Sequence, residues 1–204
     1  MHAPSISEIQ NRLRQHRAVR VDPSRARSWA SVALILRKAD GEDSGLELLF
    51  IRRAVKAGDP WSGHMAFPGG RQEPRDETLY ATAVRETAEE VGLDLTSSAS
   101  FIAPLDDQIS PLREGHHALA IRPQVFLSRD LPKLMPNEEV QRCYWFSLSS
   151  LLDPRHRETM PYHWKGSRLQ LPVIRIDDAD IWGLSLRMWD SFVRVVWNRH
   201  PEAV

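Results

Sequence analysis

The sequence predicts a single α/β domain built on a mixed β-sheet, and three observations support this fold class. The chain has 204 residues, enough for one well-packed domain and too few for a second domain of full size. Apolar residues make up 42% and charged residues 26% of the chain, which is ordinary for a globular protein. Apolar runs of strand length alternate with a few segments of helical periodicity, which favours a sheet covered by helices.

Composition also argues against several classes of protein. Lys plus Arg and Asp plus Glu both total 27, and this zero net charge argues against a protein that coats nucleic acid or a membrane surface. The single cysteine, Cys143, excludes an intrachain disulfide and a cysteine-rich metal site, which fits a reducing compartment. No apolar run approaches the ~20 residues that span a bilayer. We therefore expect a cytoplasmic protein; the arginine-rich first thirty residues leave an organellar transit peptide as the alternative.

The segment 1–28 is expected to form a helix and a linker that precede the main domain at 29–204. A helix is predicted because apolar residues recur at helical spacing, close to serines that can cap the first turn. The apolar positions are Ile6, Ile9 and Leu13, and the candidate caps are Ser5 and Ser7.

Strands of the main domain are predicted from short apolar runs bounded by turn residues, and the first two are expected to pair as a hairpin. A short helix is expected at 149–152, and a final helix at 181–198. The predicted strands are 30–37, 46–52, 64–67, 100–105, 119–127 and 143–146, with an edge strand at 171–176 after a strand-poor segment. The final helix is expected to bury Leu184, Met188, Phe192 and Val195.

The most informative stretch, residues 69–93, follows Pro68 and runs from a Gly-Gly turn through a polar loop into a helix that ends at Gly92. One helix face carries glutamates at i, i+3 and i+4, whose like charges repel by a few tenths of a kcal/mol per pair. A solvated acidic face is the ordinary interpretation, but a bound cation such as Mg²⁺ would explain the cluster better. The glutamates are Glu86, Glu89 and Glu90, and the predicted apolar face is Ala81, Val84, Ala88 and Val91.

This stretch resembles the signature box of the Nudix hydrolases. The family pattern in its second half is Arg-Glu, an apolar residue, any residue, Glu-Glu, any residue, Gly and an apolar residue. This chain reads RETAEEVGL there, with Thr87 in place of the usual apolar residue. In the first half, six residues instead of five separate Gly70 from Glu77, so either Asp76 is in register or the loop carries one extra residue. Counting back seven residues from Arg85 selects Glu77.

The resemblance implies a single-domain α/β/α sandwich that uses Mg²⁺ or Mn²⁺ to hydrolyse the pyrophosphate bond of a nucleoside diphosphate linked to another moiety. Arg85 is expected to orient a glutamate, Glu77, through a bidentate bond. Glu138 or Glu139 could add a metal ligand or a base, or could be an ordinary pair of loop acids. The catalytic candidates are Glu77, Arg85, Glu86, Glu89 and Glu90, and the metal candidates are Gly70, Glu86, Glu89, Glu90 and Glu139.

Residues 48–70 are similar to the coenzyme A pyrophosphatase branch of the family, which implies coenzyme A or its thioesters as substrate. The shared features are the pair Arg53-Ala54, a glycine at Gly63 ahead of Phe-Pro-Gly-Gly, and the extra residue in the box spacer. Asp59 stands where the branch has an arginine, which would weaken binding of the 3′-phosphate unless Lys56 or Arg52 takes over. The substrate-binding candidates are Arg53, Gly69, Gly70 and Glu114, the last in a loop at 106–117 that also carries His116 and His117 and whose residues could equally be solvated.

Two other functions remain open from the sequence. A hydrolase of the same family could act instead on ADP-ribose, dinucleoside polyphosphates or nucleoside triphosphates. A non-catalytic nucleotide sensor is the alternative from another class, although a pure binder has no need of three clustered glutamates. A homodimer contact through Trp164, Trp189 and Trp197 is one interpretation of the aromatic C-terminal region, and core packing is the other.

Overall fold

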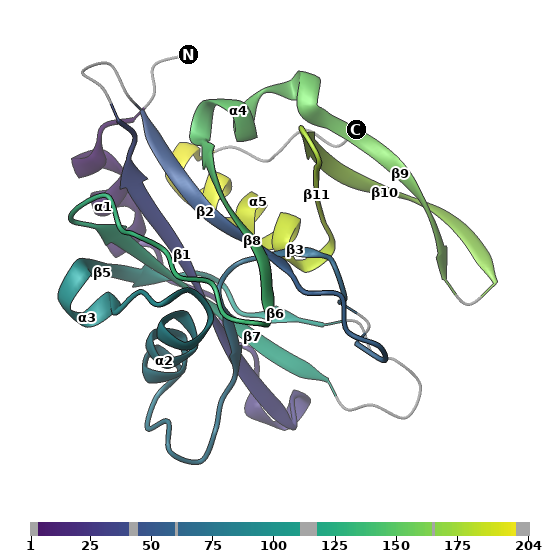
Figure 1. The fold of residues 1–204 in the computed structure, drawn as a ribbon, viewed down its shortest axis with the longest axis horizontal. Helices are drawn as coiled ribbons and strands as arrows, with labels where there is room; N and C mark the ends of the chain where they lie inside the picture. Colours follow the sequence, from purple (N-terminus) through teal and green to yellow (C-terminus); the bar gives the residue numbers. More distant parts are fainter. Residues whose placement is uncertain (1–3, 41–44, 60, 111–117, 165, 199–204) are drawn as a thin grey trace.

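A mixed β-sheet forms the centre of the structure, a computed structural model that describes residues 4–40, 45–59, 61–110, 118–164 and 166–198 (Figure 1). The sheet runs in the order β3-β2-β1-β7-β5, while β4, β6 and β8 pair with β1, β7 and β2. Among the strand pairs that the described residues form in this sheet, only β1–β7 is parallel, so the sheet is mixed as predicted. The strands are β1 (Ser28–Lys38), β2 (Leu46–Arg53), β3 (Met65–Ala66), β4 (Gly69–Arg71), β5 (Ala99–Pro104), β6 (Gln108–Ile109), β7 (Leu119–Ser128) and β8 (Val140–Ser147).

Helices cover both faces of the sheet. Alternate residues of β1 point to opposite sides, so apolar side chains on each face need a covering layer. One face packs with α1 (Ile6–Gln15) and α5 (Gly183–Trp197), and the other packs with α2 (Leu79–Val91). On β1, Leu34 and Leu36 belong to the first core and Ala33 and Ile35 to the second. The predicted α/β/α arrangement is therefore confirmed. Within the described ranges, no helix is long and apolar enough to cross a membrane.

The N-terminal helix α1 is part of the same core as the sheet. Ser5 caps it, and the Ser5 side chain and Glu8 form a reciprocal capping box. Ile9 and Leu13 are fully buried and join the core that α5 shares with the sheet. The predicted helix and its cap are confirmed.

The C-terminal region differs from the sequence-based expectation. It forms a second sheet of three antiparallel strands in the order β11-β10-β9, comprising β9 (Arg157–Trp164), β10 (Ser167–Ile176) and β11 (Ala179–Trp182). The segment expected to lack strands is therefore a strand, and β10 lies in the middle instead of at an edge. The long β9–β10 hairpin extends away from the main sheet (Figure 1). The first six residues of β10 are exposed or partly exposed, so the apolar alternation that marks a half-buried strand is missing there.

The last helix begins later than predicted, because the first two residues of the predicted range belong to β11. Met188 and Phe192 are buried as expected, whereas Leu184 and Val195 are only partly buried. Trp189 is 1% exposed and lies in the core, so core packing accounts for this tryptophan. Four short helical segments complete the described elements: α3 (Leu95–Ser98), α4 (Leu148–Leu152), which matches the expected helix, and the 3-10 turns η1 (Pro23–Arg25) and η2 (Pro154–His156).

Candidate active site

The Gly-Gly turn of the signature stretch becomes strand β4 and lies directly against α2. Gly70 pairs with Ser31 and Gly69 with Val32 on β1, which fixes the turn at the sheet. A Cβ atom on Gly70 would lie 2.5 Å from the carboxylate carbon of Glu86. The Glu86 carboxylate therefore packs against bare backbone, and a larger residue at position 70 would displace it.

Helix α2 turns a different face to the sheet from the one predicted. Its N-cap is Thr78, and it ends at Gly92 in the left-handed conformation. Among the four residues of the predicted apolar face, Val91 is buried, but Ala88 is exposed. The buried face instead includes Thr87, whose hydroxyl donates a hydrogen bond to the Ala83 carbonyl at 2.7 Å. The hydroxyl is satisfied within the helix, so threonine fits the place where the family pattern has an apolar residue.

This rotation of α2 buries Glu90. Its side chain is 3% exposed, and one carboxylate oxygen accepts a hydrogen bond from the Gly69 amide at 2.8 Å. Burial raises the pKa of Glu90 to about 7, and the negative charges of Glu86 and Glu139 act in the same direction. The Gly69 amide and the Arg53 guanidinium oppose this shift without cancelling it. A nearby cation would stabilise the charged form of this buried carboxylate.

The other two helix glutamates are less buried and are already bonded to arginines. Burial also raises the pKa of Glu86, which accepts a hydrogen bond from Arg85 at 2.9 Å. Glu89 has a side chain that is 47% exposed, and it accepts bonds from Arg85 at 2.9 Å and from Arg75 at 3.0 Å. The three glutamates thus lie on one side of α2 as predicted, but in environments that differ strongly.

Arg85 orients an acidic residue, but the residue is Asp76 and not Glu77. The Arg85 Nε and Nη2 atoms donate to the two Asp76 carboxylate oxygens at 2.9 and 2.8 Å, which is a bidentate pair. This pair holds the pKa of Asp76 well below its usual range, since the hydrogen bonds from Arg85 outweigh the effect of burial. The predicted partner of Arg85 is therefore wrong: Glu77 is exposed, while the Asp76 side chain is 4% exposed. The loop turns Asp76 inward, and counting residues cannot show which of two adjacent acids faces the helix.

Two further segments bring charged groups to the same place. Arg53, at the end of β2, lies with Nη1 4.0 Å from a carboxylate oxygen of Glu90. The Ala54 amide donates to the Glu139 carbonyl at 2.8 Å, so the ends of β2 and the loop before β8 are joined. The structure thus brings Arg53, Gly69, Gly70 and Glu139 to the helix glutamates, as predicted. Glu114 lies outside the described residues, as do His116 and His117.

The donor set suits a divalent cation of the magnesium class. Its side chains offer carboxylate oxygens, which such hard ions prefer, and the box carries more acidic groups than the arginines neutralise. In the described part of the chain, no three acidic, histidine or cysteine side chains already converge as a finished ion site. Oxygens of Glu86 and Glu89 accept hydrogen bonds from Arg85, and Glu89 also accepts one from Arg75. Glu86, Glu89, Glu90 and Glu139 are the residues that could hold the ion.

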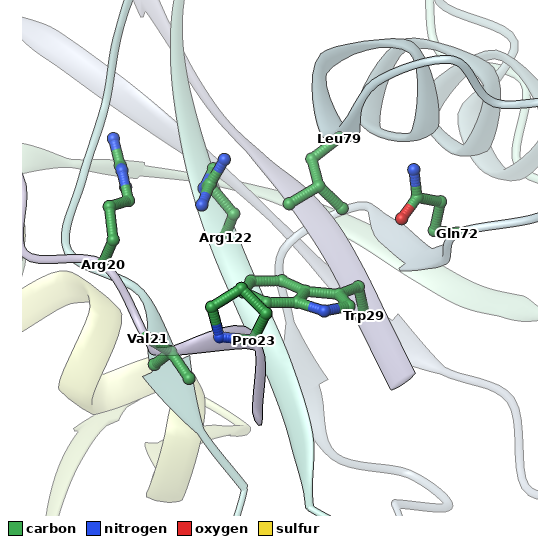
Figure 2. A pocket seen from close by; sticks show the side chains of 7 residues that line it. All are labelled: Arg20, Val21, Pro23, Trp29, Gln72, Leu79 and Arg122. Carbon is green, nitrogen blue, oxygen red and sulfur yellow. The ribbon is translucent and has the colours of Figure 1, made fainter. Parts of the chain in front are cut away.

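A pocket of about 340 Å³ lies near the start of α2 and is separate from these carboxylates (Figure 2). Its lining residues include no acid, and its two arginines, Arg20 and Arg122, both bond to the fully buried carboxylate of Asp107. The Arg122 guanidinium lies 5.6 Å from the centre of the Trp29 ring. These contacts fasten the N-terminal linker to β7. The lining residues are Arg20, Val21, Pro23, Trp29, Gln72, Leu79 and Arg122.

Comparisons with known proteins agree with this geometry. A family model described as the NUDIX domain matches residues 27–163. The uncharacterized protein C14C4.10c of Schizosaccharomyces pombe is 35% identical over 151 residues, covering 66% of this chain and 46% of that protein. The mitochondrial coenzyme A diphosphatase NUDT8 of Mus musculus is 30% identical over 142 residues, covering 68% of this chain and 65% of that protein.

Two more similarities extend over most of the chain. Nudix hydrolase 15, mitochondrial, of Arabidopsis thaliana is 29% identical over 190 residues, covering 90% of this chain and 64% of that protein. The crystal structure of a MutT/nudix family protein from Enterococcus faecalis has a TM-score of 0.55 at 20% identity, covering 95% of this chain and 70% of that chain. At this identity the likeness shows the fold. The chain spans between 46% and 65% of the length of the three curated relatives named here.

Proposed function

The chain belongs to the Nudix family, and from this premise we propose that it is a divalent-metal-dependent hydrolase of a pyrophosphate bond. Its substrate would be a nucleoside diphosphate linked to another moiety. The observation that carries the proposal is the Glu90 carboxylate, which is 3% exposed, has a pKa raised to about 7 and lies beside two other acids. Keeping such a group buried destabilises the protein unless a cation compensates it. A purely structural helix has no reason to carry it.

The residues of the box would have two roles, to hold the metal ion and to position the residues that hold it. Mg²⁺ or Mn²⁺, when bound, would neutralise phosphate oxygens and lower the pKa of a water molecule. Glu86, Glu89, Glu90 and Glu139 would hold the ion, and the backbone at Gly70 would let it approach closely. Arg85 would keep Glu86 and Glu89 in place, because it donates to both at 2.9 Å while Asp76 fixes its other edge.

The reaction is a hydrolysis that needs no other reactant than water. The water oxygen bonds to one phosphorus atom, the bond between that phosphorus and the bridging anhydride oxygen breaks, and the bridging oxygen leaves with the other phosphate. The two protons of water pass to solvent as the two product phosphates ionise, which is nearly complete above their second pKa of about 6. The products are a nucleoside monophosphate and the phosphorylated second half. Glu77 is proposed from the sequence as a further catalytic residue, and its exposed position leaves it free to meet solvent and substrate.

Coenzyme A or one of its thioesters is the substrate that we favour. Support comes from residues 48–70, which are similar to the coenzyme A branch, and from the 30% identity to the mouse coenzyme A diphosphatase. Two cations near the box differ in availability: Arg52 is paired with Asp178 at 2.9 Å, while Lys56 is exposed. Lys56 is therefore the better candidate to meet a 3′-phosphate in place of the arginine that Asp59 replaces. ADP-ribose, dinucleoside polyphosphates and nucleoside triphosphates are the alternatives of the same class.

A panel of substrates tests both levels of this proposal. Purified protein with Mg²⁺ or Mn²⁺ is incubated with coenzyme A, dephospho-coenzyme A, ADP-ribose, a dinucleoside polyphosphate and a nucleoside triphosphate, and products are separated by chromatography. We expect a nucleoside monophosphate and a second phosphorylated product, with coenzyme A cleaved best. Cleavage of another member with a higher kcat/KM would move the substrate to the alternative. Absence of product from every member with either metal would favour the nucleotide sensor.

A further inference from the structure

Arg53 lies between two carboxylates that compete for its guanidinium. Its Nη2 atom donates to Asp59 at 3.0 Å, whereas its Nη1 atom stays 4.0 Å from Glu90. The first distance is that of a charge-assisted hydrogen bond, and the second is at the outer limit of an ion pair. The Arg53 Nε atom is buried without a hydrogen-bond partner in the described part of the chain. The guanidinium is therefore held in an orientation that does not satisfy its own donors fully, and Asp59 is the group that holds it.

Asp59 is itself fixed by the loop that carries it. Its second carboxylate oxygen accepts the Trp61 amide at 3.0 Å, and its own amide donates to the Lys56 carbonyl at 3.1 Å. The Ser62 hydroxyl closes the loop, since it accepts the Lys56 amide at 2.6 Å. Burial disfavours the charge on Asp59, but bonds from Trp61 and Arg53 outweigh it and lower the pKa. Asp59 is thus a rigid anion.

We propose that Asp59 is a positioning residue that keeps the Arg53 guanidinium off Glu90, so that the Glu90 carboxylate remains available to a divalent cation. The proposal rests on the metal site of the proposed function. Without Asp59, Arg53 would be free to close the gap to Glu90, where a buried arginine–carboxylate bond is strong. An arginine bonded in this way would have to be displaced before a metal ion could bind. An arginine at position 59 could not perform this role.

The test measures metal binding directly and therefore does not depend on turnover. Free Mn²⁺ is determined by electron paramagnetic resonance during titration of the wild type, Asp59→Asn, Arg53→Gln and the double variant. We expect Asp59→Asn to raise the Kd for Mn²⁺ about tenfold, which corresponds to about 1.4 kcal/mol. In the Arg53→Gln background, the same Asp59→Asn change should alter the Kd by less than about twofold, because no guanidinium remains to compete.

A matched control comes from another ion pair of the same kind. Arg157 forms a bidentate pair with Asp190 at 2.9 and 2.8 Å, and its Nε atom is also buried without a partner in the described part of the chain. Asp190→Asn should leave the Kd for Mn²⁺ unchanged. Asp59→Glu retains the carboxylate and should stay within about threefold of the wild type, and circular dichroism checks that each variant is folded.

The outcomes separate this proposal from the proposed function. An unchanged Kd in folded Asp59→Asn overturns the positioning role, even if the protein hydrolyses its substrate. An equal loss of affinity in the Arg53→Gln background also overturns it, because the effect would then be the loss of a nearby negative charge. A Kd that shifts as expected in a protein without hydrolytic activity supports the positioning role and contradicts only the hydrolase. A wild type that does not bind Mn²⁺ contradicts both.

Discussion

Two clusters of carboxylates and arginines in the described part of the molecule are balanced in opposite ways. The box cluster consists of Arg53, Arg75 and Arg85 with Glu73, Asp76, Glu86, Glu89, Glu90 and Glu139, so acidic groups are in excess. The linker cluster consists of Asp106 and Asp107 with His16, Arg20, Arg122 and Arg194, so basic groups are in excess.

The pKa values follow this balance. In the linker cluster, burial acts to raise the pKa of Asp106 and Asp107, but bonds from backbone amides and basic side chains lower both overall. In the box cluster, burial prevails and the pKa of Glu90 rises to about 7. The Asp107 side chain is even more buried than that of Glu90, at 0% against 3% exposure. Burial alone therefore does not distinguish a functional acid from a structural one, whereas the local excess of charge does.

Replacing Glu90 by glutamine gives the largest expected effect and tests the functional side of the comparison. Glu90→Gln should lower metal-dependent turnover by about 10²- to 10³-fold, the scale on which loss of one charge-stabilising group acts. The fold should remain intact, because glutamine still accepts the Gly69 amide without a buried charge. Initial rates with Mg²⁺ and Mn²⁺ measure the first point, and thermal unfolding measures the second. Turnover within tenfold of the wild type would show that the buried acid is structural after all.

The pH dependence of stability should differ in sign between the two clusters. Glu90 in the folded protein has a pKa raised from 4.5 to about 7, so folding holds a proton that the unfolded chain loses in this window. Its contribution is complete below about pH 4.5 and is lost as pH rises through about 7, on the order of 3 kcal/mol. The lowered pKa values of Asp106 and Asp107 act conversely: their contribution is present above about pH 4 and is lost as pH falls below it.

Urea unfolding between pH 3 and pH 8 in the presence of a chelator measures both windows. The decline toward pH 7 should become much smaller in Glu90→Gln, where the raised pKa of Glu86 remains, and Mn²⁺ added in place of the chelator should oppose the decline in the wild type. The decline at acid pH should persist in both proteins. A wild-type stability that stays level from about pH 4.5 to 7 would contradict the raised pKa of Glu90.

Replacing Asp107 by asparagine tests the structural side. Asp107→Asn leaves Arg20 and Arg122 without their shared anion, and we expect a loss of about 2 kcal/mol in the free energy of unfolding. The figure lies below that for a fully buried pair because the arginine side chains are 37% and 25% exposed. The midpoint of urea unfolding measures the loss. The Kd for Mn²⁺ should be unchanged, and a weaker Kd would mean that the two clusters are coupled.

The smallest effect concerns the two adjacent acids ahead of α2. Asp76→Asn should reduce stability by about 1–2 kcal/mol, because Arg85 loses a bidentate, charge-assisted partner. Glu77→Gln, at an exposed neighbour, should change stability by less than about 0.5 kcal/mol. Thermal unfolding of both variants measures the difference. A larger loss of stability in Glu77→Gln than in Asp76→Asn would show that Glu77 is the partner of Arg85, as residue counting predicts.

The sequence predicted the main sheet, the first helix and the residues of the box well, because each depends on local patterns. Strand runs, helix caps and the Gly70–Glu86 proximity all follow from short-range chemistry or from one continuous motif. The face of α2 was less predictable, since Ala81, Val84 and Ala88 are small and bury little area in any orientation. The orientation of the helix is instead set by hydrogen bonds of its polar residues, such as the bond from the Gly69 amide to Glu90.

Contacts between distant segments explain the remaining differences. The Asp59–Arg53 bond joins a strand end to a loop, and no spacing rule indicates which cation an isolated aspartate will meet. Strand β9 has no buried position along residues 157–163, so it lacks the buried alternation on which strand prediction depends. Both features become visible only when the packing of the whole chain is known.

The parallel pairing of β1 with β7 also has a kinetic consequence. It joins Ser28–Leu36 to Leu119–Leu127, so two strands that lie far apart in the sequence must meet before the pair can form. Such non-local contacts slow folding, because the entropy of loop closure is lost before the contacts compensate it. The carboxylates of Glu90 and Glu139 approach each other only in the folded protein. A metal ion that binds them would therefore recognise the native state alone, and would prolong its lifetime by slowing unfolding instead of speeding folding.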